Sequence, residues 1–319
     1  MQNQTLLLLG AAHVHLADHL RHVEDRGWRI GAIHDRDTER RDRLCADLNA
    51  EPLDSLEAIA QTGCVGAIVC SETAHHEADI SAALTAGLPV FSEKPLAASA
   101  DAAQRCADLA EDKGILLHTG YFFRTNTALK QLKSALEDGM IGRIIDARMR
   151  FSHDGGYADW LDLDCWMTDP ALACYDGFVD EAVHVIDMLQ WLVGPISAGH
   201  AVTGNALGWP LDDHGAAAVT FENGATGVVE AGWTDTTMRL EIALVGENGA
   251  AQLADGDLTV IKRGADTPAL TATIPPLDAG EGIEPFLDAL EGKDTVDLVP
   301  PRAAVSVNAL LDAMALRRC

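Results

Sequence analysis

Basic residues are scarce in this chain of 319 residues. Its 23 lysines and arginines face 49 aspartates and glutamates, which gives a net charge of −26. Nucleic acid and anionic membrane surfaces are therefore poor partners, because an acidic surface repels phosphate. The acidic residues are spread along the chain and form no tail, so the sequence predicts a solvated acidic surface around a globular core.

Long apolar runs and a basic leader are also missing. No stretch approaches the roughly 20 apolar residues that cross a bilayer, and Met1–Thr5 lacks the basic region of a secretory signal. The seven cysteines form no Cys-x-x-Cys pair and no zinc-like spacing. We therefore expect reduced thiols, a cytoplasmic location and no metal bound by these cysteines.

Short apolar runs alternate with amphipathic stretches through residues 1–120. Strands are predicted at Leu6–Leu9, Trp28–Ile33, Val65–Cys70, Val90–Ser92 and Ile115–Thr119, and helices follow the first four of them. Strands that are apolar throughout and separated by helices indicate a parallel sheet covered on both faces. We expect a doubly wound α/β dinucleotide-binding domain of the Rossmann type, with ligands at the carboxyl ends of its strands.

The pattern changes in residues 121–319, for which we expect an α+β substrate domain. Helices are predicted at Thr127–Glu137 and Phe178–Leu192, and a strand at Arg143–Phe151. Extended runs from Ser197 to Lys262 are joined by Asn-Gly and Asp-Gly turns, which favour tight hairpins and a large, mostly antiparallel sheet with helices on one face. Two terminal helices, near 283–290 and 301–316, are candidates to pack back on the first domain.

The turn after the first strand reads Gly10-Ala-Ala-His-Val-His15 and keeps only the first glycine of the G-x-G-x-x-G fingerprint. Ala12 stands where the backbone approaches the phosphates, and His13 beside it is able to donate a hydrogen bond. Asp35 lies 25 positions after Gly10, where a carboxylate accepts the ribose hydroxyls and favours NAD over NADP. Arg36 leaves NADP open, because it could meet a 2′-phosphate or stack on adenine. Alternatively, Asp35 only caps the next helix.

Three further residues carry the chemistry. Lys94 lies at the carboxyl end of the strand Val90–Ser92, so we expect it to point toward the ligand crevice. Asp180 and His184 are four positions apart and share a helix face. His184 could take a proton from a hydroxyl while Asp180 binds a neighbouring hydroxyl or holds the imidazole. The other interpretation is a surface ion pair or a core histidine.

As a whole the chain resembles the glucose–fructose oxidoreductase / inositol dehydrogenase / MocA (Gfo/Idh/MocA) family. The matching pieces follow the family's order and spacing, and they are the Gly10 turn, Asp35, Glu93-Lys94-Pro95, Gly120–Arg124, Gly139-Met-Ile-Gly142, Asp180-Glu-Ala-Val-His184 with Asp187, Phe221–Gly224 and Val245–Gly249. The sequence departs from the family at Ser71-Glu72-Thr73, where a Thr-Pro-Asn is usual, and in the glycine turn.

The resemblance implies an NAD(P)-dependent oxidoreductase that moves a hydride between nicotinamide and a secondary alcohol or carbonyl of a sugar or polyol. It assigns catalysis and substrate binding to Lys94, Asp180 and His184. It implies cofactor contacts from Ser71, His76, Glu93 and Lys94, beside those of Gly10, Ala12, His13, Asp35 and Arg36. Tyr157, Trp160 and Trp166 are candidates to wall the substrate pocket, since sugars stack on aromatic rings. A homo-oligomer, dimer or tetramer, is expected through the open face of the sheet.

Other functions use the same residues. A lyase or glycosidase without net redox change would retain the nicotinamide, Lys94 and His184. A ligand sensor would need no acid/base group, so the presence of Lys94, Asp180 and His184 together argues against it. A metal enzyme is a further alternative, built on His13, His15, His75, His76 and His184, but no tetrahedral set is evident, and we expect no metal.

Overall fold

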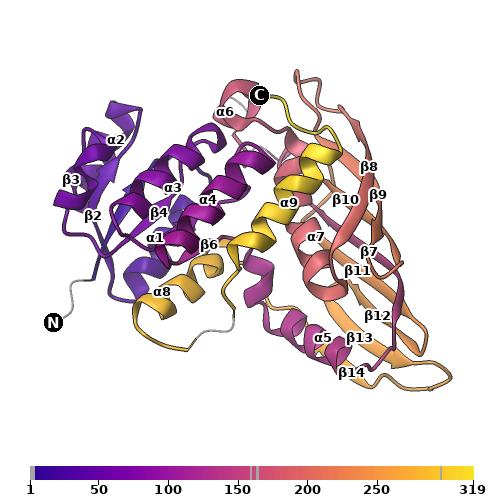
Figure 1. The fold of residues 1–319 in the computed structure, drawn as a ribbon. Coiled ribbons are helices and arrows are strands. Elements are labelled where there is room, and N and C mark those ends of the chain that lie inside the picture. Colours follow the sequence, from indigo (N-terminus) through magenta and orange to yellow (C-terminus); the bar gives the residue numbers. More distant parts are fainter. Residues whose placement is uncertain (1–3, 159, 163–164, 295–296) are drawn as a thin grey trace. The chain divides into compact units, whose positions relative to one another are not determined.

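The computed structural model describes residues 4–158, 160–162, 165–294 and 297–319 (Figure 1). The chain divides into two compact units. Unit 1 comprises Met1–Phe122, Ala171–Cys174 and Asp278–Asn308, and unit 2 comprises Phe123–Pro170, Tyr175–Leu277 and Ala309–Cys319. Unit 1 therefore takes in two segments from beyond residue 120.

Unit 1 is built on a six-stranded sheet in the order β3-β2-β1-β4-β5-β6. Its strands are β1 (Thr5–Leu9), β2 (Arg29–His34), β3 (Glu51–Pro52), β4 (Gly66–Val69), β5 (Val90–Ser92) and β6 (Leu117–Thr119). Every neighbouring pair is parallel, which confirms the predicted doubly wound sheet. The short strand β3 was not predicted, because its two residues are exposed and carry no apolar signal.

Helices connect these strands because the sequence supplies both apolar faces and caps. They are α1 (Leu16–Asp25), α2 (Thr38–Leu48), α3 (His76–Thr85) and α4 (Ala100–Lys113), with 3₁₀ turns η1 (Leu56–Gln61) and η2 (Thr73–His75). The later segment of unit 1 adds the 3₁₀ turn η5 (Ala279–Ile283) and helix α8 (Glu284–Leu290). Asp37 caps α2 by accepting from the N–H groups of Glu39 and Arg40, both at 3.0 Å. The alternative that Asp35 caps this helix is therefore wrong.

A cluster of charges ties α8 to α1 within unit 1. Arg26 donates to three carboxylates, which belong to Glu284, Asp288 and Glu291. Partial burial would raise the pKa of Glu291, but hydrogen bonds from Lys293, Arg26 and Trp28 lower that pKa to about 2. The segment that follows Asp278 is thus held to α1 by ion pairs as well as by the apolar contacts of Phe286 and Leu287.

Unit 2 contains an eight-stranded sheet in the order β14-β13-β12-β11-β7-β10-β9-β8. Its strands are β7 (Ile144–Ser152), β8 (Ile196–Gly204), β9 (His214–Phe221), β10 (Thr226–Gly232), β11 (Arg239–Gly246), β12 (Gly249–Ala254), β13 (Asp257–Lys262) and β14 (Leu270–Thr273). Only the central pair β7–β10 is parallel among these strands. The mostly antiparallel sheet is confirmed, and the predicted turns connect β9 to β10, β11 to β12 and β12 to β13.

Helix α7 (Gly177–Val193) covers one face of this sheet, where it packs on β7 and β10. Thirteen of its seventeen residues are buried, which suits an apolar helix at the centre of a core. The remaining helical segments are η3 (Phe122–Thr125), α5 (Thr127–Glu137), η4 (Trp166–Thr168), α6 (Pro170–Ala173) and α9 (Pro301–Ala313). The opposite face of the sheet carries exposed residues such as Val202 and Glu230.

Among the described residues, no helix has the length and apolar character that a membrane crossing requires. The expectation of uniformly reduced thiols is wrong for two cysteines. Cys174 and Cys319 are disulfide-bonded, whereas Cys45, Cys64, Cys70, Cys106 and Cys165 are free. The free ones at 45, 64, 70 and 106 are buried, as small hydrophobic residues usually are.

Candidate functional site

The turn after β1 requires glycine at its first position. Gly10 has a φ of +74°, and a Cβ there would lie 2.2 Å from the Cα atom of Ser71. The backbones of the turns that follow β1 and β4 therefore touch, and only a residue without a side chain permits this contact. The predicted role of Gly10 as the tight-turn glycine agrees with this geometry.

The backbone donors of this turn are already engaged. The N–H groups of Ala12 and His13 both donate to the carbonyl of Cys70, at 3.0 and 3.1 Å. The Ala11 N–H donates to Asp35 at 2.7 Å, the Leu16 N–H to the His13 carbonyl at 3.1 Å, and the His15 N–H to the His13 ring at 3.3 Å. The turn thus presents few backbone donors to a phosphate, unlike a usual helix N-terminus.

Asp35 lies buried at the end of β2, and its carboxylate is held by an arginine that the sequence analysis missed. The Arg40 guanidinium donates to both Asp35 oxygens, at 2.8 and 2.7 Å, and to Glu72 at 2.9 Å. Burial would lower the pKa of Arg40, but hydrogen bonds to Asp35 and Glu72 raise it. Arg40 therefore stays charged between two carboxylates.

Arg36, the other basic residue here, is engaged elsewhere. Its guanidinium makes two hydrogen bonds to the fully buried Asp79 of α3, at 2.8 and 3.1 Å. Arg40, rather than Arg36, is thus the cation beside Asp35.

Three histidines surround Glu93 in unit 1. The His19 Nε2 lies 2.6 Å from Glu93 Oε1, the His13 Nε2 lies 3.4 Å from Oε2, and the His15 Nδ1 lies 3.5 Å from Oε1. Glu93 is 1% exposed. Burial would raise its pKa, but the histidines, His13 foremost, hold it well below the usual range. Glu93 is therefore a buried carboxylate stabilised by imidazoles.

The remaining predicted residues of unit 1 lie on the loops after β4 and β5. The ring of His76 bridges these loops, since its two nitrogens lie 2.9 Å from the Pro95 carbonyl and 3.0 Å from the Ser71 carbonyl. Lys94 is 3% exposed, and its backbone N–H donates to the Glu93 carboxylate at 2.9 Å. Their contacts with a cofactor stay a prediction.

In unit 2, Asp180 and His184 lie one turn apart on α7. The Trp233 indole donates to Asp180 Oδ2 at 3.0 Å. The His184 ring is 2% exposed, and the rings of Phe123 and Phe151 contact it edge-on at 5.7 and 6.0 Å. His184 is thus a buried histidine in an apolar setting, and Asp180 is oriented by a tryptophan.

Trp233 is positioned by the glycine that begins α7. A Cβ at Gly177 would lie 2.8 Å from the Trp233 ring, so the ring occupies the space above this residue. The indole is 1% exposed. The glycine before the predicted Asp180 therefore lets a buried tryptophan reach that aspartate.

A second histidine–carboxylate pair lies beside Asp180. The His153 Nδ1 accepts the Gly155 N–H at 3.0 Å, which leaves Nε2 as the protonated nitrogen that donates to Glu181 at 2.9 Å. The side chains of His153, Asp180 and Glu181 lie close enough to form one polar group. Sequence reasoning missed His153 and Glu181, although His153 lies two residues after the predicted strand Arg143–Phe151 and Glu181 directly follows Asp180.

The three aromatic residues predicted to wall a pocket have different surroundings. Tyr157 and Trp160 are 60% and 52% exposed. The Trp160 ring lies 4.6 Å from the His153 ring and donates to Asp154 at 3.1 Å. Trp166 packs against a small apolar cluster that includes Trp233. Trp160 and Trp166 are thus near the polar group of unit 2, and their contact with a substrate stays a prediction.

A buried ion pair fixes α7 in unit 2. Arg124 donates to both oxygens of Asp187, at 2.8 and 2.6 Å, and the two residues are 8% and 1% exposed. Burial raises the pKa of Asp187, while Arg124 lowers it by a smaller amount. The pair lies on the same helix as Asp180 and His184, and so helps to position them.

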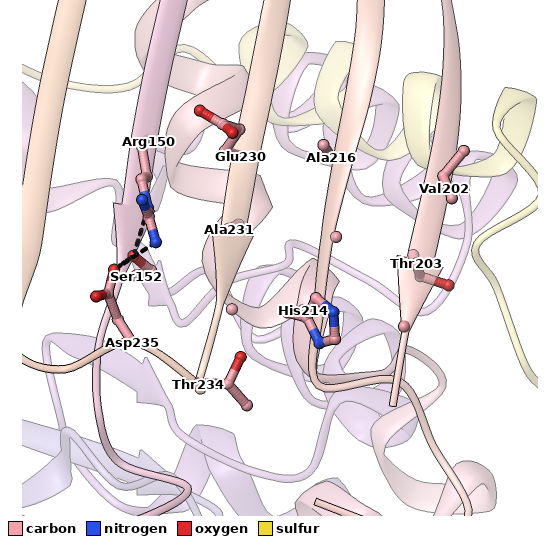
Figure 2. A pocket seen from close by; sticks show the side chains of 13 residues that line it. Arg150, Ser152, Val202, Thr203, His214, Ala216, Glu230, Ala231, Thr234 and Asp235 are labelled. Carbon is pink, nitrogen blue, oxygen red and sulfur yellow. Dashed lines mark hydrogen bonds and ion pairs between the residues drawn. The ribbon is translucent and has the colours of Figure 1, made fainter. Parts of the chain in front are cut away.

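A pocket of about 530 Å³ lies on the outer face of the unit 2 sheet, across β7, β10, β9 and β8. Figure 2 shows Arg150 and Ser152 of β7 bound to Asp235, and His214 on β9, with β10 between these two strands. The His214 ring hydrogen-bonds to Asp213 at 2.6 Å. None of the predicted site residues is among the described residues that line this pocket.

Comparison with protein families assigns most of the chain. Residues 6–121 match the model described as oxidoreductase family, NAD-binding Rossmann fold. Residues 129–252 match the model described as GFO/IDH/MocA C-terminal domain. The two matches cover the β1 turn, Glu93, Asp180 and His184.

Related proteins point the same way. The levoglucosan dehydrogenase of Pseudarthrobacter phenanthrenivorans is 32% identical over 49% of this chain and 46% of that protein. An inositol 2-dehydrogenase/D-chiro-inositol 3-dehydrogenase of Shouchella clausii is 31% identical over 55% and 49%. The chain thus matches about half the length of these two. The inositol 2-dehydrogenase of Acidothermus cellulolyticus is 30% identical over 77% of this chain and 72% of that protein.

Solved structures share the fold along the whole chain. Levoglucosan dehydrogenase in complex with NADH and levoglucosan has a TM-score of 0.81 at 22% identity, covering 98% of both chains. An oxidoreductase domain protein from Kribbella flavida has a TM-score of 0.85 at 21% identity, covering 99% of this chain and 96% of that one.

Proposed function

The chain belongs to the Gfo/Idh/MocA family of oxidoreductases, and on that premise we propose that it transfers a hydride between NAD and a secondary alcohol or carbonyl carbon of a sugar or polyol. The observation that carries this proposal is the Asp180–His184 pair on α7, with Asp180 oriented by Trp233. Relatives named levoglucosan dehydrogenase and inositol 2-dehydrogenase support the substrate class.

Each residue has a defined task in this proposal. The nicotinamide, when bound, supplies the hydride acceptor for oxidation. His184 removes the hydroxyl proton at a ring nitrogen, and its apolar surroundings exclude water from that step. Lys94 stabilises the alkoxide that develops as the proton leaves. Asp180 accepts a hydrogen bond from a neighbouring substrate hydroxyl.

Residues of unit 1 fit a dinucleotide in part. Gly10 supplies the tight turn, and Asp35 supplies a carboxylate at the end of β2 for the adenosine ribose. The Asp35 oxygens already accept two backbone N–H groups and Arg40. Ribose binding at Asp35 therefore displaces Arg40, which keeps Glu72 as its partner. NAD is the expected cofactor, and Arg40 is the residue able to meet the 2′-phosphate of NADP.

The test is turnover with defined substrates. Levoglucosan, myo-inositol and related polyols are incubated with NAD or NADP, and NADH or NADPH is followed by absorbance. We expect turnover with NAD, and a decrease in kcat/KM of about 10²–10⁴-fold in His184→Ala, which is the usual contribution of a general base. Arg143→Gln, a change of one exposed side chain on the same unit, is the control for general damage.

The same assay separates the alternatives. Stoichiometric NADH identifies a dehydrogenase. Product formation without net NADH identifies the lyase or glycosidase. Ligand binding without any product identifies a sensor. Wild-type kcat/KM in His184→Ala would contradict the catalytic assignment whatever the substrate.

We further propose a homo-oligomer through the outer face of the unit 2 sheet, and the cytoplasmic location stays a prediction. The outer face offers exposed residues on β8 and β10, among them Val202, which is 69% exposed. Light scattering is expected to give twice or four times the 33.9 kDa chain mass. Val202→Lys is expected to shift the assembly toward smaller species, and a monomeric wild type contradicts this proposal.

A further inference from the structure

The turn after β1 lacks most of the features with which such a turn usually binds a phosphate, namely the glycines and the unengaged backbone N–H groups. Two of the three fingerprint glycines are absent, and the backbone donors between Ala11 and Leu16 are largely engaged within the protein. In their place, two histidine side chains converge on a buried carboxylate. A phosphate at this turn would therefore need a positive group other than the backbone.

Distances among these side chains match metal ligands better than hydrogen bonds. The His13 Nε2 and His15 Nδ1 atoms lie 3.4 and 3.5 Å from the oxygens of Glu93, beyond the usual range of about 2.7–3.2 Å for a hydrogen bond. Two ligands of a tetrahedral zinc ion, each about 2.0–2.1 Å from the metal, lie about 3.3–3.4 Å apart. The three ligand atoms all lie within 4.8 Å of one another.

The Glu93 carboxylate also has hydrogen-bond partners outside the proposed ligand set, as the ligands of metal sites usually do. The His19 Nε2 binds Glu93 Oε1 at 2.6 Å, and the Lys94 N–H donates to Oε2 at 2.9 Å. His19 is fully buried, and its ring packs edge-on against Phe91 at 4.9 Å. Glu93 is therefore fixed in orientation before any ion arrives.

Coordination fixes the tautomer of His13 and leaves one side of the site open. A metal at the His13 Nε2 requires the proton to sit on Nδ1, so the long 3.3 Å contact from the His15 N–H is given up. The side chain of His15 is 25% exposed, whereas those of His13 and Glu93 are 2% and 1% exposed. The site therefore opens past His15.

We propose that His13, His15 and Glu93 bind a divalent transition-metal ion of the zinc class. Two imidazoles and one carboxylate form a three-ligand set that leaves a fourth position for an outside ligand. The next step rests on the proposed function: an oxygen of the dinucleotide pyrophosphate occupies this fourth position. The ion thereby replaces the positive end of the helix and the missing backbone donors.

Cobalt binding tests the site itself. Chelator-treated protein is titrated with Co²⁺, whose absorption reports tetrahedral coordination, and Zn²⁺ is then added as a competitor. We expect one ion per chain, displaced by Zn²⁺, with at least tenfold weaker binding in His15→Gln and in Glu93→Gln. His15 is partly exposed, so its variant disturbs the core least.

Two control variants make the result specific. His200→Gln removes an exposed histidine of unit 2 and is expected to bind as the wild type does. Glu181→Gln breaks the second histidine–carboxylate group, which contains His153 and Asp180. The site is overturned if no Co²⁺ binds, if His15→Gln binds it as tightly as the wild type, or if only Glu181→Gln loses it.

Phosphate ligation is tested separately. Inorganic pyrophosphate is added to the Co²⁺ protein, and NADH is titrated into metal-free and Zn²⁺-loaded protein. We expect a change in the Co²⁺ spectrum and at least tenfold tighter NADH binding with zinc. Equal NADH affinity with and without zinc overturns the phosphate role. Failure of NADH to bind either form contradicts the proposed function, while the cobalt result still decides the metal site.

Discussion

Gly10→Ala is expected to destabilise the protein by about 2–5 kcal/mol and, on the proposed function, to abolish NADH binding. A left-handed backbone costs an alanine about 1–2 kcal/mol. Gly10 has a φ of +74°, and the new Cβ would also lie 2.2 Å from the Ser71 Cα. Relief of that overlap requires backbone movement, for which overpacking typically costs about 1–3 kcal/mol more.

Gly27 provides a matched control for this prediction. Its φ is +75°, and nothing lies within 4 Å of a Cβ built on it. Gly27→Ala therefore carries only the backbone strain, about 1–2 kcal/mol. Urea unfolding of both variants gives the two free energies, and NADH titration gives the affinity. Equal losses of stability in the two variants would show that the contact with Ser71 has no cost.

Arg124→Met is expected to lower the free energy of unfolding by about 3–5 kcal/mol, because it leaves a buried charge without its partner. Asp187 is 1% exposed and accepts two hydrogen bonds from Arg124. The double variant Arg124→Met/Asp187→Leu is expected to recover most of the loss, since replacing both charges by apolar groups is often neutral. Urea unfolding of the two singles and the double measures the coupling.

An exposed ion pair of unit 2 supplies the control. Arg143 and Glu247 are bound at 2.6 Å, but their side chains are 57% and 47% exposed. Arg143→Met is therefore expected to change stability by less than about 1 kcal/mol. A similar loss in Arg143→Met and Arg124→Met would contradict the explanation by burial.

The stability deficit of Arg124→Met should also depend on pH. Burial raises the pKa of Asp187, so the folded protein takes up a proton there at a higher pH than the unfolded chain does. Protonation removes the unpaired buried charge, and the deficit should shrink as the pH falls through that raised pKa. A deficit that is constant between pH 7 and pH 4 would mean that the lost stability comes from packing.

Local signals were sufficient wherever neighbours in sequence decide the structure. Helix α5 spans the predicted Thr127–Glu137, and the Asn126 side chain caps its first turn. The hairpins β9–β10, β11–β12 and β12–β13 form at their Asn-Gly and Asp-Gly turns, because these dipeptides favour tight turns. The parallel sheet of unit 1 follows from strands that are apolar on both faces.

Local sequence signals did not predict contacts between residues that are distant in the sequence. Arg40 had no feature that marked it as the partner of both Asp35 and Glu72, and Trp233 reaches Asp180 from 53 residues away. The predicted role of Arg36 rested on sequence adjacency to Asp35, yet its side chain binds Asp79 instead. A helix places side chains on several faces, and only packing decides which face meets which loop.

The sequence by itself determined the two kinds of sheet, the family and the residue types capable of the chemistry, because periodicity, turns and ordered motifs are local properties. Only the tertiary structure decided which of those residues meet. It joined His13, His15 and His19 to Glu93, although no metal was expected from the histidine spacing alone. The reason is physical. A buried carboxylate needs hydrogen-bond donors, and these come from the elements that the sheet topology brings to the same strand ends. The distance between residues along the sequence does not reveal which elements those are.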